Sequence, residues 1–108
     1  MEDNPLSAPV LRQLGVRFRC LPLGEGKLLF CTLPGGITFD LWEREEGVLL
    51  WRFVGRVPWA GGGPLPKAGW SVTVTEEGDV CLCRAGRLSA GLVGEFIRAI
   101  SHPAFTSF

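Results

Sequence analysis

The sequence lacks an excess of charge of either sign. Its 108 residues include 11 Lys and Arg and 11 Asp and Glu, so the formal net charge is zero. Proteins that bind nucleic acids normally carry a basic excess, because neutralising phosphates supplies much of their affinity. The balance therefore disfavours nucleic acid as a partner. It also gives the chain little electrostatic protection against association, which favours a protein partner.

A long apolar run is also missing from the sequence. None of its apolar segments approaches the roughly 20 residues that a membrane-spanning helix needs, so we expect no membrane partner. The first residues, Met1-Glu2-Asp3-Asn4, are acidic where a signal peptide would be basic. We therefore expect a cytoplasmic protein whose four cysteines are reduced.

Residues that could carry out catalysis or bind a metal are few. His102 is the single histidine, and it stands beside a proline with no catalytic motif around it. Gly61–Gly63 lacks the strand–loop–helix context and the Lys-Ser/Thr ending of a phosphate-binding loop. The cysteines lack the paired spacing of a zinc site and are interpreted as packing residues: Cys20, Cys31, Cys81 and Cys83. We therefore predict no enzyme activity, no catalytic residue, no metal and no cofactor.

The composition that remains is that of a folded protein. Hydrophobic residues make up 46% and charged residues 20% of the chain, and its length suits a single domain over residues 1–108. The predicted fold class is α+β, an antiparallel sheet with a short N-terminal helix and a C-terminal helix packed on one face. In chain order we predict a helix at 7–14, a β-meander at 17–54, a Pro/Gly loop at 55–69, a β-hairpin at 70–84 and a helix at 89–101.

The two predicted helices have recognisable ends. Ser7 can cap the first helix and Gly15 ends it, whereas Ser89 is the expected cap of the second. The second helix ends at His102-Pro103, because the residue before a proline is disfavoured in helical geometry. Its apolar stripe at helical spacing consists of Leu92, Val93, Phe96, Ile97 and Ile100.

The most informative segment is the predicted hairpin Ile37–Val54, which is apolar on both faces. An antiparallel sheet in a small domain usually has one face packed against the core and one face exposed to solvent. One face of this hairpin collects Ile37, Phe39, Leu41, Val48, Leu50 and Val54. The other collects the residues that we predict to bind a partner, namely Trp42, Leu49, Trp51 and Phe53, with Trp59 of the loop as a further candidate.

An alternative stays open for this second apolar face. Its residues could instead pack under the N-terminal helix and the Gly55–Gly69 loop, so the face that is buried in the monomer is not fixed by the sequence. The same tryptophans, with Arg44, Arg52 and Arg56, could also stack the bases of a single-stranded nucleic acid. The charge balance favours a protein partner over this reading.

Two polar positions carry separate expectations. Asp40 falls within a strand beside tryptophans, where a cross-strand or partner-facing ion pair is favoured over general acid–base catalysis. Cys20 is expected directly across from Cys31, if the first turn centres on Glu25-Gly26. In a reducing cytosol this pair would form a contact and not a disulfide.

As a whole, the pattern resembles the type III secretion chaperone family of the Tir-chaperone type. The resemblance begins with Leu11–Gly15, a helix that ends in a Leu-Gly turn. Three strands follow, with an acidic-Gly turn at Glu45–Gly47, and the strands are Lys27–Phe30, Ile37–Trp42 and Val48–Phe53. The chain closes with the hairpin Trp70–Cys83 and the helix Leu88–Ile100. It implies a cytoplasmic chaperone, associated with virulence, that binds a secreted effector or a secretion component and forms a homo- or heterodimer.

The chain departs from this family in one segment. Family members usually carry a second helix between the third and fourth strands, which commonly takes part in dimerisation, whereas Val57–Lys67 is a Pro/Gly loop here. They are also commonly acidic. A bacterial family of sensory-transduction regulators has the same general architecture, so an interaction domain of that type is the alternative that the resemblance leaves open.

Overall fold

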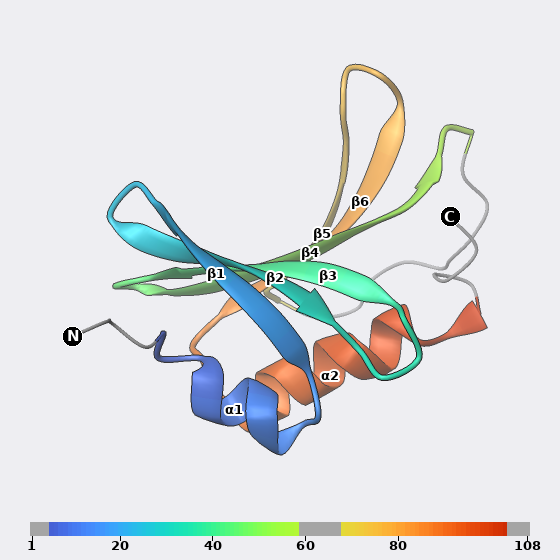
Figure 1. The fold of residues 1–108 in the computed structure, drawn as a ribbon. Helices are drawn as coiled ribbons and strands as arrows, with labels where there is room; N and C mark the ends of the chain where they lie inside the picture. The colour runs from blue at the N-terminus through green and yellow to red at the C-terminus, as the bar shows by residue number, and fades with distance from the viewer. Residues whose placement is uncertain (1–4, 59–67, 104–108) are drawn as a thin grey trace.

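The computed structural model describes residues 5–58 and 68–103 of the chain. The helices among these residues are α1 (Ala8–Gln13) and α2 (Ala90–Ile100), and the strands are β1 (Arg17–Leu23), β2 (Gly26–Thr32), β3 (Thr38–Arg44), β4 (Gly47–Arg56), β5 (Trp70–Val74) and β6 (Asp79–Gly86) (Figure 1). All strand pairs are antiparallel, in a 6-stranded sheet of order β1-β2-β3-β4-β6-β5. The predicted α+β fold class is confirmed.

The strand order places β6 inside the sheet and β5 at its edge. Strands β1 to β4 follow one another as a meander, but β4 pairs next with β6 and not with β5. The β5–β6 hairpin rises away from the helices (Figure 1). The strand β4 runs to Arg56, so the chain leaves the sheet later than the predicted loop start at residue 55. Trp59 lies outside the described residues.

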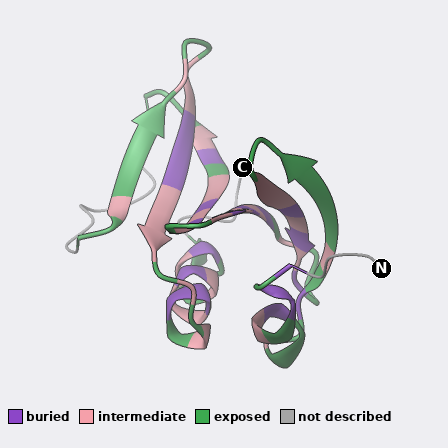
Figure 2. Cartoon of the chain, turned by 90° about the vertical axis from the view of Figure 1, so that its left-hand side faces the viewer, coloured by how far each residue is buried: buried purple, intermediate pink, exposed green. Residues whose placement is uncertain are grey.

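Both helices lie on the same side of the sheet, below it in Figure 1, and they cover the central part of one of its two faces. The apolar side chains of this covered face and the stripe of α2 form one core, which appears in purple along β4, β6 and α2 in Figure 2. Phe96 of α2 lies at its centre, with its ring centroid 5.5 Å from that of Phe39 and 5.9 Å from that of Trp70. The buried members of the core are Leu11, Val16, Leu29, Cys31, Leu33, Phe39, Leu41, Val48, Leu50, Val54, Val80, Leu82, Leu92, Val93, Phe96 and Ile100.

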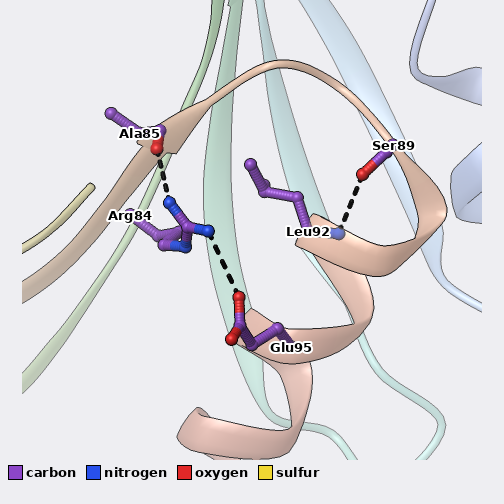
Figure 3. A network of polar contacts seen from close by, with 5 residues as sticks. All are labelled: Arg84, Ala85, Ser89, Leu92 and Glu95. Atoms are coloured by element: carbon purple, nitrogen blue, oxygen red, sulfur yellow. Dashed lines mark hydrogen bonds and ion pairs between the residues drawn. The ribbon is translucent and has the colours of Figure 1, made fainter. Parts of the chain in front are cut away.

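The helix α2 begins where the sequence predicts. The Ser89 hydroxyl accepts a hydrogen bond from the Leu92 backbone N–H at 3.0 Å, which satisfies one of the free donors at the helix start (Figure 3). Arg84 of β6 ties the same helix to the sheet, because its guanidinium contacts Glu95 at 3.2 Å and donates to the Ala85 carbonyl at 2.7 Å.

The start of α1 differs from the prediction. Ser7 has helical backbone angles and its side chain makes no capping bond. Its hydroxyl donates instead to the carboxylate of Glu43 on β3 at 2.8 Å, and the backbone N–H groups of Leu6 and Ser7 donate to the same carboxylate at 2.7 and 2.9 Å. Ser7 therefore occupies the predicted N-cap position but forms no capping bond, because its hydroxyl is bound by a side chain of the sheet that is distant in sequence.

The register of the first hairpin also corrects a prediction. The turn centres on Gly24 and Glu25, and Gly24 takes a positive φ of 60° that favours glycine. Cys20 therefore pairs with Leu29, and Phe18 pairs with Cys31. The expected Cys20–Cys31 pair was wrong because the turn lies one residue earlier, which moves every partner by two positions. Cys20 is exposed, so its interpretation as a packing residue was also wrong, whereas Cys31 and Cys81 are buried.

Candidate functional site

The candidate site is the sheet face opposite the helices, which we call the open face. The register places Leu28, Trp42 and Leu49 in one row across β2, β3 and β4. The next row runs from Phe30 through Asp40 to Trp51, and Phe53 follows Trp51 on the same side of β4. On β2, β3 and β4 the large apolar members of the open face are therefore Leu28, Phe30, Trp42, Leu49, Trp51 and Phe53, and Leu21 of the edge strand β1 continues the first row beside Leu28.

None of these six side chains is buried. Phe53 is 38% exposed and the other five are partly exposed, in contrast to the buried residues that alternate with them along the strands. Four of the six are the predicted partner-binding residues, and the register brings them together as neighbours. Since α1 lies on the other side of the sheet, it does not cover them, and no described helix does (Figure 1).

The open face extends onto β6 through two thiols. Cys83 pairs with Trp51, and Cys81 pairs with Phe53. Their sulfur atoms are 3.8 Å apart, and the hydrogen bond with Cys81 lowers the pKa of Cys83 to about 6 while it raises that of Cys81. Within the described residues, no group of three or more His, Cys, Asp and Glu side chains is placed to hold a metal ion.

One carboxylate lies within this apolar surface. Asp40 stands between Phe30 and Trp51 across the sheet and between Thr38 and Trp42 along β3. It makes no hydrogen bond or ion pair with another described residue, so the expected cross-strand ion pair does not form. Burial raises the pKa of Asp40, because the apolar surroundings disfavour the charged form.

A hollow of about 400 Å³ opens beside Asp40. Trp51 and Phe53 line it together with Thr38, at the point where β3 begins and β4 continues past it. Arg52 lines it as well, but its Nη1 donates to the Thr38 carbonyl oxygen at 2.7 Å. The hollow therefore combines aromatic surface with a carboxylate that has no protein partner among the described residues.

The arginines that could have bound phosphates are engaged elsewhere. The Arg44 guanidinium lies 4.5 Å from the Trp42 ring centroid and 3.5 Å from the Glu46 carboxylate. Arg56 pairs with Asp79 at 3.1 Å. Together with the bond from Arg52 to Thr38, these contacts leave the three arginines of the nucleic-acid alternative bound to the protein itself.

Sequence reasoning missed two members of the open face, Leu28 and Phe30 of β2. The signal was present, since Leu28–Cys31 is apolar at every position and so places apolar side chains on both faces, as the hairpin Ile37–Val54 does. The described residues contain no helix that is long and apolar enough to cross a membrane. Searches of protein-family models, of curated proteins and of solved structures find no match for this chain.

Proposed function

We propose that this chain is a non-enzymatic protein-binding module of the chaperone or adaptor type, which holds an extended segment of a client protein against the open face. The observation that carries the proposal is the set of six large apolar side chains left partly exposed opposite the helices. Covering them would contribute on the order of several kcal/mol before ordering costs, at roughly 25 cal/mol per Å².

The charges on this surface favour a protein client over a nucleic acid. Asp40 would repel phosphates at the centre of the face, and Arg44 and Arg56 already have acidic partners. Tryptophan and other aromatic residues are enriched at protein interfaces, where they form a buried apolar centre. Single-stranded nucleic acid is therefore the alternative that the experiment below must exclude.

The sheet edges differ in their readiness to accept an added strand. The edge strand β1 carries Arg17, Arg19 and Pro22, which are features that oppose pairing with another chain. The edge strand β5 is Trp70-Ser-Val-Thr-Val74, with no charged residue and no proline. A client segment that extends beyond the open face would therefore pair more readily with β5 than with β1.

The resemblance to type III secretion chaperones suggests a client class, a secreted effector or a secretion component, and a homo- or heterodimeric assembly. A sensory-transduction-regulator type of interaction domain would use the same surface for a signalling partner. Light scattering on a sizing column, with the chain alone and co-expressed with products of neighbouring genes, measures the assembly. A monomer that binds none of them would count against the chaperone proposal.

The direct test uses tryptophan fluorescence, to which Trp42 and Trp51 of the open face contribute. We expect twelve-residue apolar peptides with alternating Val and Leu to change this fluorescence on titration. Single-stranded oligonucleotide should leave it unchanged at low and high salt. Tight, salt-sensitive quenching by the oligonucleotide would instead support nucleic-acid binding.

Two variants provide a matched comparison for this titration. Phe53 on the open face and Val72 on the opposite side of the sheet are 38% and 39% exposed. Phe53→Ser should weaken peptide binding about tenfold. Val72→Ser should leave it unchanged, because the Val72 side chain lies on the side of buried Leu82 and a client paired with β5 would bind its backbone. Equal effects of the two substitutions would contradict the open face as the binding site.

A further inference from the structure

Asp40 is a carboxylate without a partner on the open face, and a client bound there would shield it from water. The register makes it the one carboxylate that β2, β3 and β4 place on the open face. It lies between two aromatic side chains, Phe30 and Trp51, and no described residue binds it. A client that covered this carboxylate with apolar atoms alone would bury an unpaired charge, which is strongly unfavourable.

From this arrangement we infer that the hollow beside Asp40 receives a lysine or arginine side chain of the client segment. The inference rests on the proposed function, because it specifies the chemistry of the client that the open face binds. The carboxylate supplies the ion pair, and the rings of Trp51 and Phe53 supply apolar and π surface for the stem and the cationic head.

The charges around the hollow are compatible with this occupant. Arg52 also lines it, but it alternates with Trp51 along β4, and its guanidinium is bound to the Thr38 carbonyl. Arg19 is laterally aligned with Asp40, two strands away, and its guanidinium lies over Phe30, 5.9 Å from the ring centroid. Neither of these arginines makes an ion pair with Asp40, which leaves the carboxylate available to a cation from outside.

A client of this chemistry differs from a purely apolar one in its specificity. An apolar face without a charge would bind many apolar segments and would discriminate little among them. The carboxylate makes a neutral or acidic residue unfavourable at the central position, so it selects for segments with a cation among apolar neighbours. The open face would supply most of the affinity, and Asp40 would supply the choice of partner and register.

The test uses four twelve-residue peptides of alternating Val and Leu that differ at one central position, which is Lys, Arg, norleucine or Glu. Binding is measured by fluorescence anisotropy of a terminal label. We expect the wild-type protein to bind the Lys and Arg peptides about fivefold or more tightly than the norleucine peptide, and the Glu peptide most weakly. Asp40→Asn should abolish the difference between Lys and norleucine, and Asp40→Lys should reverse the order of Lys and Glu.

Glu45→Gln is the matched control, because it removes an exposed carboxylate from the β3–β4 turn and should leave the preference intact. Thermal unfolding followed by circular dichroism checks that each variant is folded. Equal binding of the Lys and norleucine peptides to the wild-type protein would overturn the inference about the cation and leave the proposed function standing. Absence of binding by all four peptides would overturn the proposed function, and this inference with it.

Discussion

The strand β3 presents two carboxylates to opposite faces of the sheet, and their surroundings differ completely. Glu43 faces the helices, is 7% exposed, and accepts three hydrogen bonds from Leu6 and Ser7 at the start of α1. Asp40 faces away from the helices and binds no described residue. Glu43 is thus satisfied within the fold, as buried polar groups normally are, whereas the half-buried carboxylate of Asp40 is left open to solvent or to a partner outside the fold.

The first prediction compares two phenylalanines on the two sides of the sheet. Phe96→Ala should lower the free energy of unfolding by about 3–5 kcal/mol, because it opens a cavity at the centre of the core. Phe53→Ala on the open face should lower it by about 1 kcal/mol or less, since that side chain already contacts solvent. Urea unfolding measures both, and a large loss for Phe53→Ala would mean that the open face belongs to the core.

Removal of the carboxylate that serves the fold is expected to have the next largest effect. Glu43→Ala should lower the free energy of unfolding by about 2–3 kcal/mol, because it leaves the donors of Leu6 and Ser7 without an acceptor. Glu46→Ala removes a side chain that is 70% exposed and should cost about 0.5 kcal/mol or less. If the two variants unfold at the same urea concentration, the hydrogen bonds of Leu6 and Ser7 to Glu43 contribute nothing to stability.

Thiol reactivity also distinguishes the two faces of the sheet. Burial raises the pKa of Cys31 on the covered face to about 12, whereas the hydrogen bond with Cys81 lowers that of Cys83 to about 6. In a Cys20→Ser background, iodoacetamide at pH 7 should modify Cys83 about tenfold or more faster than Cys31, as tandem mass spectrometry that assigns the modified cysteine within each tryptic peptide would show. Protection of Cys83 by a bound peptide would locate that peptide on the open face, and equal rates would contradict the comparison.

The smallest expected effect is that of replacing Asp40, and this replacement should raise the free energy of unfolding instead of lowering it. Its pKa is raised in the folded protein, so its ionisation stabilises the unfolded state more than the folded state as pH rises through that value. Asp40→Asn should therefore raise the free energy of unfolding slightly at pH 7.

This gain should shrink as the pH falls below the raised pKa of Asp40, where the wild-type side chain is neutral as well. Arg52 lines the hollow beside Asp40, and Asp40 acts electrostatically on the thiols of Cys31 and Cys81, so these groups are part of the same titration. Urea unfolding at pH 7 and pH 4 tests the prediction. A loss of stability for Asp40→Asn at pH 7 would show that the carboxylate has a partner within the fold.

The sequence was informative wherever local pattern decides the structure. Alternation along Ile37–Val54 predicted both faces of β3 and β4, and helical spacing predicted the buried stripe of α2. It failed where residues distant in sequence meet, as at Ser7 and Glu43. It also failed at the turn after β1, where two glycines flank Glu25 and composition alone does not choose the centre of the turn.

Because β6 lies between β4 and β5, a chain that lacks β6 leaves one edge of β4 without a partner strand. The 10-residue strand β4 finishes the meander, yet its outer edge stays unpaired until β6, which follows 22 intervening residues, reaches it. A nascent or truncated chain that ends before residue 79 would present that backbone edge, with Trp51 and Phe53 beside it, to any other strand. Such fragments should aggregate, and the last third of the chain thus keeps the first half from associating with itself.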